Sequence, residues 1–82
     1  MFFIYILQSQ KSGRHYIGFT HNIQERLQLH NSGRVKATKS KGPWKVIYQE
    51  SFSTAKEARR REYEIKSYKG GNSFKRLIRS ID

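Results

Sequence analysis

The chain has 82 residues, no cysteine, and 17 lysines and arginines against six aspartates and glutamates, which gives a net charge of +11. These totals exclude disulfide bonds and thiolate metal sites. The apolar run Phe2–Leu7 is far shorter than the ~20 residues of a membrane span and lacks the flanks of a secretion signal, so we expect a cytoplasmic location. The charge predicts a polyanionic partner, with nucleic acid as the first candidate. A ribosomal role would carry the same charge, whereas we expect no membrane partner, because no predicted helix pairs a basic face with a broad apolar one.

Two segments near the N-terminus have the composition of paired strands. Phe2–Leu7 is rich in aromatic and β-branched residues, and His15–Thr20 follows the turn signal Lys11–Gly13. The two segments predict an antiparallel hairpin. Because side chains alternate between the faces of a strand, we expect Tyr5 and Tyr16 to be cross-strand neighbours on one face, with Tyr5 paired with Tyr16.

A helix is predicted to follow. Asn22 is a good N-cap, Glu25 can complete a capping pair, and Asn31–Gly33 ends the helix in the manner of a left-handed cap. Arg26 stands beside the apolar face of this helix. The residues at helical spacing on that face are Ile23, Leu27 and His30.

The segment 34–43 is basic and almost without apolar side chains, so it predicts an exposed loop. Its basic residues are Arg34, Lys36, Lys39 and Lys41. Trp44–Tyr48 then predicts a third strand, with Pro43 at its start, where a missing N–H group is tolerated.

Two more helices complete the chain. Thr54–Glu57 fits a capping box that begins the second helix, Gly70–Gly71 stops it, and Asn72 or Ser73 can cap the last one. The inward face of that last helix would consist of Phe74, Leu77, Ile78 and Ile81. The order β-β-α-β-α-α predicts an α+β fold with helices packed against one small sheet.

Glu62 lies on the apolar stripe of the second helix, between Ala58 and Ile65. A buried carboxylate must be paired, protonated or bound to a metal, because a lone buried charge is too costly. Three interpretations are open: an ion pair with an arginine such as Arg26, an oxygen ligand for Mg²⁺ or Mn²⁺, or an exposed side chain on a tilted stripe.

Arg26 and His30 stand one helical turn apart and can reach the same point. Arg26 either extends its stem along the apolar face or clamps a phosphate oxygen with its guanidinium group. His30 is either a structural histidine or part of the same site. Tyr5 and Tyr16 are either core aromatics or, beside a cation, groups able to take a proton from an attacking water.

These spaced positions resemble the GIY-YIG nuclease superfamily. Tyr16-Ile17-Gly18 matches the second tripeptide of the name literally, and Phe3-Ile4-Tyr5 matches the first at the usual separation of the two tyrosines. Arg26 stands ten residues past the second tyrosine, where the family has an arginine, and His30 matches the helix histidine of many members.

The predicted helix around Glu62 is similar to the family's helix with a metal-binding glutamate, since Glu57, Ala58 and Lys66 stand at similar places. The resemblance covers about residues 2–80 and is greatest for small stand-alone members related to the excinuclease nuclease domain. It implies one nuclease-like domain over residues 1–82, with a three-stranded antiparallel sheet flanked by helices.

The resemblance also implies how such a protein would act. One divalent ion, Mg²⁺ or Mn²⁺, would bind to Glu62. A water would attack a DNA phosphodiester in line with the leaving oxygen, and the products would carry 5′-phosphate and 3′-hydroxyl ends. In that scheme Tyr5 or Tyr16 orients or deprotonates the water. Arg26 stabilises charge on the phosphoryl oxygens, and His30 carries a proton or contacts the phosphate. The four basic residues of the 34–43 segment would bind the nucleic-acid backbone.

Two positions depart from the family pattern: Phe3 stands in place of a glycine, and Asn72 lies near the family's asparagine without matching its spacing. We predict a metal-dependent endonuclease for structured, nicked or damaged DNA, because the chain is too short to carry an added sequence-reading module. The alternative is a binding module for DNA, RNA or the ribosome that keeps the fold without cleaving.

Overall fold

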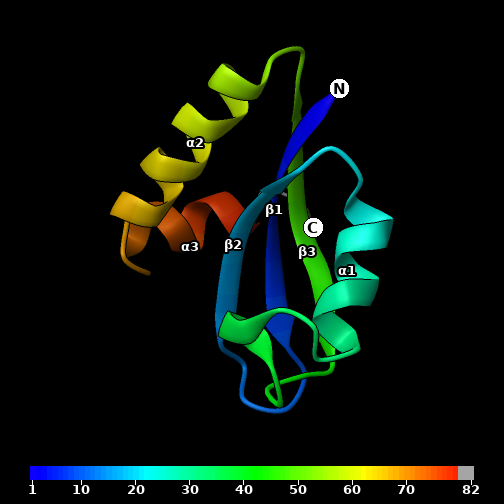
Figure 1. The fold of residues 1–82 in the computed structure, drawn as a ribbon. Helices are drawn as coiled ribbons and strands as arrows, with labels where there is room; N and C mark the ends of the chain where they lie inside the picture. Colours follow the sequence, from blue (N-terminus) through cyan, green and yellow to red (C-terminus); the bar gives the residue numbers. More distant parts are fainter. Residues whose placement is uncertain (80–82) are drawn as a thin grey trace.

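The computed structural model describes residues 1–79, and its elements follow the predicted order β-β-α-β-α-α (Figure 1). Their bounds are β1 (Phe2–Ser9), β2 (His15–Thr20), α1 (Ile23–Asn31), the 3₁₀ turn η1 (Lys36–Thr38), β3 (Trp44–Phe52), α2 (Ala55–Ser67) and α3 (Asn72–Arg79). The predicted α+β class is confirmed, while Ile81 lies outside the described residues. Within residues 1–79, no helix has the length and apolar character needed to cross a membrane.

The sheet is antiparallel, and its strand order β2-β1-β3 places β1 in the middle (Figure 1). The predicted pairing of Tyr5 with Tyr16 is wrong, because Tyr5 stands opposite Gly18 and Leu7 stands opposite Tyr16. The two tyrosines are diagonal neighbours on the predicted common face, with their ring centroids 6.4 Å apart. This shift leaves a glycine, and no side chain, directly across from Tyr5.

The two faces of the sheet carry different cores. Figure 1 shows α1 over one face, with α2 and α3 on the other side. The core under α2 and α3 consists of the buried residues Ile4, Ile6, Ala58, Ile65 and Phe74, with further apolar side chains packed around them. The core under α1 consists of Tyr5, Leu7 and Trp44, against which Ile23 and Leu27 pack. We call them the α2 core and the α1 core.

The predicted caps fix where the helices begin and end. The Asn22 side chain accepts a hydrogen bond from the Glu25 N–H at 3.1 Å, and Thr54 accepts one from the Glu57 N–H at 3.2 Å. Each bond satisfies one of the free N–H groups of a first helical turn. Gly33 follows α1 with a φ of +79°, a left-handed conformation that glycine adopts without strain.

An ion-pair network holds α2 against the sheet. Arg61 donates to the Glu50 carboxylate of β3 at 3.0 Å and to Glu64 at 2.6 Å, and the Tyr48 hydroxyl donates to Glu50 as well. Burial alone raises the pKa of Glu50, but the hydrogen bonds from Arg61 and Tyr48 outweigh it and leave that pKa lowered. Glu50 is therefore ionised at neutral pH and anchors α2 through Arg61.

Ser9, at the end of β1, joins two loops, the hairpin loop 10–14 and the segment 34–43, and it is only 2% exposed. Its hydroxyl oxygen accepts hydrogen bonds from the N–H groups of Lys11 and Ser12 at 3.1 and 3.0 Å and donates to the Lys41 carbonyl at 2.7 Å. The hairpin loop 10–14 is thereby fixed to the segment 34–43. That segment is mostly exposed, as predicted, but Val35 and Gly42 are half-buried and Thr38 is buried at the end of η1.

Candidate active site

An open pocket of about 440 Å³ lies across the outer edge of β2, between α1 on one side and α2 on the other. Its walls consist of Tyr5, Tyr16, Gly18, Phe19, Arg26, Arg59, Glu62, Tyr63 and Lys66. Four of the five residues predicted to be catalytic therefore border one pocket. The fifth, His30, is 1% exposed and lies behind Tyr5.

Gly18 gives the Tyr5 hydroxyl its access to this pocket. A Cβ at Gly18 would lie 2.5 Å from Tyr5 Cζ and would clash with the hydroxyl oxygen as well. The phenol of the central strand therefore passes directly over the backbone of the edge strand. The third residue of the second tripeptide must be a glycine here because the space of its side chain is filled by Tyr5.

A chain of hydrogen bonds supports Tyr5 from behind. The Tyr5 hydroxyl lies 3.0 Å from His30 Nε2, and His30 Nδ1 lies 2.7 Å from the Thr38 hydroxyl oxygen. Thr38 also lies 3.4 Å from the Val35 carbonyl, which can only accept. This carbonyl favours a chain in which Thr38 donates to Val35, His30 Nδ1–H donates to Thr38, and Tyr5 O–H donates to His30 Nε2.

The protonation states agree with that direction. Burial, reinforced by the positive charge of Arg26, lowers the pKa of His30 to about 4, so the imidazole is neutral at pH 7. Burial also raises the pKa of Tyr5, although a hydrogen bond from the Arg26 guanidinium opposes that shift. Tyr5 is therefore a neutral phenol at pH 7, with its proton toward His30, one oxygen lone pair toward Arg26 and the other lone pair able to accept.

The three rings at this site pack on one another. The Tyr16 and His30 rings meet edge to face with centroids 4.8 Å apart, and the Tyr5 and His30 centroids are 5.9 Å apart. Such contacts restrict the rotation of each ring. Tyr5 and Tyr16 therefore border the pocket as rings that are held in place by their neighbours.

Arg26 reaches the pocket from α1, and its Nε is a buried donor for which the described residues supply no acceptor. An unpaired buried N–H costs about 1–3 kcal/mol, more when it is charged. Together with Arg59 and Lys66, Arg26 places three cations around a single carboxylate, Glu62. The pocket therefore has a surplus of positive charge, which suits a phosphate group.

Glu62 faces the pocket from α2 with 21% of its side chain exposed, and its carboxylate lies 3.0 Å from Lys66 Nζ. Its ion-pair partner is thus a lysine one helical turn away, in place of the Arg26 partner considered from sequence. Within residues 1–79, no group of three or more acidic, histidine or cysteine side chains is placed to hold a metal ion. One accessible carboxylate fits a hard ion such as Mg²⁺, which keeps most of its water ligands.

The two departures from the family pattern lie away from this pocket. Phe3 borders a separate hollow beside His21 and Gln49, so its ring does not narrow the approach to Tyr5. Asn72 stands at the start of α3 and borders a groove with Lys75 and Arg76. The structure therefore gives Asn72 no part in the pocket.

Beside the predicted Glu62, the structure brings Arg59, Tyr63 and Lys66 into the pocket and Thr38 next to it, and none of these four was assigned to the pocket from the sequence. Arg59, Glu62, Tyr63 and Lys66 recur at helical spacing, so one face of α2 supplies four pocket residues. That periodicity was a usable signal. Thr38 gave none, because it binds His30 through the tertiary fold and lies in a segment without apolar neighbours.

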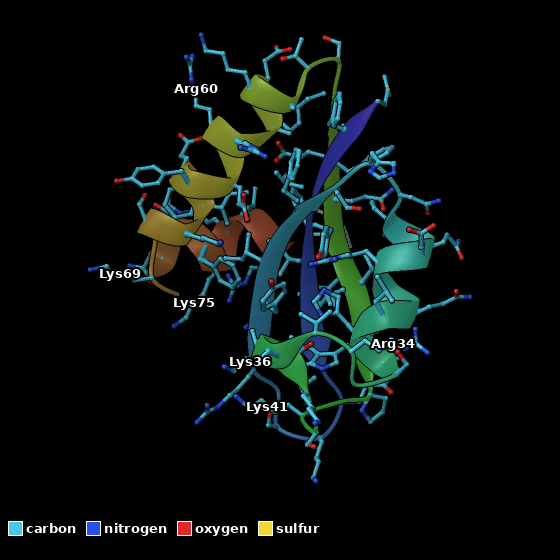
Figure 2. All side chains as sticks on the ribbon, viewed as in Figure 1. Arg34, Lys36, Lys41, Arg60, Lys69 and Lys75 are labelled. Atoms are coloured by element: carbon cyan, nitrogen blue, oxygen red, sulfur yellow. The ribbon has the colours of Figure 1, made fainter. Side chains whose placement is uncertain are left out.

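The four basic residues predicted to contact nucleic acid are Arg34, Lys36, Lys39 and Lys41, and the segment that carries them is largely exposed. Figure 2 shows Arg34, Lys36 and Lys41 projecting outward from the lower part of the molecule. Lys41 shares a hollow with Lys11 and Arg14, because Ser9 fixes the two loops together. The segment 34–43 and the hairpin loop thus form one basic surface, which we call the basic loop pair.

The fold and the pocket define a small, strongly basic α+β protein with phenols, a guanidinium group and a carboxylate around a site suited to phosphate. The sequence of residues 1–75 matches the family described as the GIY-YIG catalytic domain. The chain therefore belongs to the GIY-YIG family, as the resemblance of its motifs predicted.

Known relatives of similar length agree with this assignment. The chain is 40% identical over 76 residues to the UPF0213 protein SH2523 of Staphylococcus haemolyticus, and the aligned region covers 92% of each chain. It is 43% identical over 67 residues to the UPF0213 protein SSP2268 of Staphylococcus saprophyticus, which covers 80% of both. The solution NMR structure of the UPF0213 protein BH0048 from Bacillus halodurans is similar, with 31% identity, a TM-score of 0.57, and coverage of 100% of this chain and 86% of that one.

Proposed function

We propose that this protein is a metal-dependent endonuclease that hydrolyses DNA phosphodiester bonds. The family is a nuclease family, which makes cleavage of nucleic acid the expected activity. The observation that carries the proposal is the convergence of Tyr5, Tyr16, Arg26 and Glu62 on one open, basic pocket. These residues come from four different elements, so their convergence is a property of the fold and cannot follow from local sequence alone.

Glu62 is the residue we assign to the divalent ion, Mg²⁺ or Mn²⁺. When bound, such an ion supplies Lewis-acid stabilisation of charge on the phosphate and on the leaving oxygen. The accessible carboxylate and its position at the pocket support this assignment. Lys66 balances part of the Glu62 charge within the protein itself.

Arg26 is the residue we assign to the phosphate. Its unpaired buried Nε supports this role, because a phosphoryl oxygen is the acceptor that a charged guanidinium binds best. A guanidinium fixed in place before the reaction stabilises the charge that develops on the phosphoryl oxygens. Arg59 and Lys66 add positive charge at the same pocket.

Tyr5 is the residue we assign to the attacking water. Its proton is directed to His30, so the oxygen lone pair that Arg26 does not use can accept a hydrogen bond from a water in the pocket and orient it for in-line attack. Tyr16 borders the same space and is a second contact for water or phosphate. The buried place of His30 supports a positioning role for it, with Tyr5 held at a fixed angle.

The basic loop pair is the surface we assign to the nucleic-acid backbone, through Arg34, Lys36, Lys39 and Lys41. Exposed cations bind successive phosphates without reading sequence, and the side chains of these four residues are exposed. The proposed substrate is therefore DNA chosen by its structure, such as nicked, branched or damaged DNA, and RNA has the same backbone charge.

The test is cleavage of labelled nicked, branched and single-stranded DNA with Mg²⁺ or Mn²⁺. Glu62→Gln and Arg26→Ala should each lower the rate by about a hundredfold or more, because each removes charge stabilisation of the transition state. Glu64→Gln is the matched control: it changes a glutamate on the same helix whose ion pair is with Arg61. Cleavage that persists in both active-site variants would assign the activity to a contaminant.

The rival function, a binding module that does not cleave, has one observation in its favour: Lys66 already pairs with the carboxylate that would hold the ion. The same assay separates the two functions. Tight binding with no cleavage of any substrate, in either metal ion, would establish the rival and remove the hydrolytic roles of Tyr5 and Glu62.

A further inference from the structure

Tyr63 is an aromatic side chain that the fold of the protein does not use. It is 78% exposed, although large apolar side chains elsewhere in the two cores are buried or half-buried. Within residues 1–79, no hydrogen bond, ring contact or ion pair involves it, whereas the hydroxyl groups of Tyr5 and Tyr48 are both hydrogen-bonded. Neither packing nor hydrogen bonding therefore accounts for a tyrosine at this position.

The surroundings of Tyr63 are those of the pocket. It borders the pocket next to Glu62, and Arg59 and Lys66 stand four residues before and three residues after it on the same face of α2. The guanidinium of Arg59 is held over the Phe19 ring at 5.2 Å from its centroid. An exposed ring thus lies between two cations at the border of the proposed phosphate pocket.

This combination matches the way proteins bind single-stranded nucleic acid, in which cations follow the backbone and aromatic rings stack on successive bases. A base that is paired within a duplex is already stacked on both sides and cannot offer its face to a side chain. A ring at the pocket mouth therefore favours a strand with an unpaired nucleotide beside the phosphate that is held in the pocket.

We propose that Tyr63 is a stacking platform for an unpaired base adjacent to the bound phosphate. The preferred ligand is consequently nucleic acid with an unpaired nucleotide at that position: a gap, a flap, a loop or a single strand, in preference to continuous duplex. This inference rests on the proposed function, because it takes the pocket to be the phosphate site, and it adds the class of substrate.

The experiment is a comparison of dissociation constants in EDTA, measured by fluorescence anisotropy with wild-type protein, Tyr63→Phe and Tyr63→Ala. The ligands are a single-stranded oligonucleotide, the same strand with abasic sites in place of its nucleotides, and a blunt duplex. Because Tyr63 is exposed, both variants should fold, which circular dichroism verifies.

Tyr63→Ala should raise the dissociation constant for the intact single strand about fivefold to a hundredfold, whereas Tyr63→Phe should stay within about twofold of wild type. Neither variant should change the affinity for the abasic strand or the blunt duplex. An unchanged affinity in Tyr63→Ala, or an equal loss for intact and abasic strands, would overturn the platform. A protein partner for Tyr63 would give the first of these outcomes.

Binding in EDTA and cleavage with Mg²⁺ fail independently of each other. If the binding of the single strand depends on Tyr63 but no DNA is cut, the stacking role of Tyr63 is supported and the endonuclease activity is refuted. Cleavage of a gapped duplex at an equal rate by wild type and Tyr63→Ala, with equal affinities, would keep the endonuclease and remove the platform. Absence of binding to any of the three ligands would remove the platform, whatever the cleavage assay gives.

Discussion

The two faces of the sheet differ in what they bury. The α2 core is made of aliphatic and aromatic side chains such as Ile4, Ile65 and Phe74. On the α1 side, the phenol of Tyr5 in the α1 core and the neighbouring side chains of His30 and Thr38 are buried and joined by hydrogen bonds. One face therefore stabilises the fold by apolar burial, while the other holds polar groups in fixed orientations toward the pocket.

This contrast separates stability from chemistry within one small sheet. A polar group that is buried without a partner would cost several kcal/mol, so the α1 core is tolerable only because its chain of hydrogen bonds is complete. Substitutions of α2 core residues should change the stability of the protein and little else. Substitutions on the α1 face should change the orientation of Tyr5 as well.

The largest expected effect is on the α2 face. Ile65→Ala removes a fully buried side chain and should lower the free energy of unfolding by about 2–5 kcal/mol. The loss is measured by urea denaturation at pH 7, and Ile65→Val should cost about 0.5–1.5 kcal/mol. The affinity of the folded fraction for DNA should not change. A change in affinity at full folding would show that the two faces are coupled.

The next effect is a pH dependence from the α1 face. His30 has a pKa of about 4 in the folded protein and 6.5 as its ordinary value, so the unfolded chain takes up its proton at the higher pH. The contribution of the neutral His30 to the free energy of unfolding should therefore be at its maximum above pH 6.5. It should fall by about 3 kcal/mol as the pH drops to about 4.

Urea denaturation over this pH range checks the prediction, and His30→Gln should flatten the dependence. Burial also lowers the pKa of His15, so His15→Gln is the control that measures the part due to that residue. An undiminished slope in His30→Gln would assign the pH dependence to other groups.

A smaller effect concerns the access of Tyr5 to the pocket. Gly18→Ala should lower the free energy of unfolding by about 1–3 kcal/mol, because the added Cβ overlaps the Tyr5 ring and forces it to move. The ring should also lose its hydrogen bond to His30. The same substitution in a Tyr5→Ala background should cost much less, since the overlapping atoms are gone. Equal costs in the two backgrounds would contradict this account of the glycine.

Thr38→Val conserves the shape of the side chain and removes the group that accepts from His30. It should lower the free energy of unfolding by about 1–2 kcal/mol, because His30 Nδ1–H is left buried without a partner. Nitrogen NMR of the imidazole should show a change of tautomer. The rate of DNA cleavage should fall while the dissociation constant in EDTA stays the same. A weaker affinity with an unchanged tautomer would instead indicate a general loss of structure.

The smallest effect is expected in the basic loop pair. Lys39→Ala should reduce the slope of log K against log salt concentration by about 0.9 if this lysine contacts one phosphate of duplex DNA. Lys56→Ala, which removes an exposed lysine in the first turn of α2, is the matched control and should leave the slope unchanged. An unchanged slope in both variants would take Lys39 out of the binding surface.

The sequence predicted the order of elements, the caps and most of the candidate site, because these follow from local patterns. Asn22, Thr54 and Gly33 act as expected, and the strand alternation places Tyr5 and Tyr16 on one face. Alternation fixes the face of a residue but leaves the register free in steps of two. Pairing Tyr5 with Tyr16 or with Gly18 keeps the same face, and only the hairpin geometry selects Gly18.

The remaining parts of the site depend on contacts between distant segments. Thr38 binds His30 from a segment that has no pattern of its own, and no sequence rule predicts that contact. The pairing of Glu62 with Lys66, in contrast, follows from their spacing of one helical turn and was available from sequence.

Arg61 and Glu62 are consecutive residues of α2 that point in different directions: Arg61 forms an ion pair with Glu50 of β3, and Glu62 faces the pocket. Consecutive side chains on a helix point about 100° apart. A rotation of α2 about its axis would therefore displace the Glu62 carboxylate only if it also broke the ion pair between Arg61 and Glu50. A high salt concentration screens and weakens ion pairs at partly exposed sites such as this one. The geometry at Glu62 is therefore tied to ionic conditions through a residue that never touches a ligand.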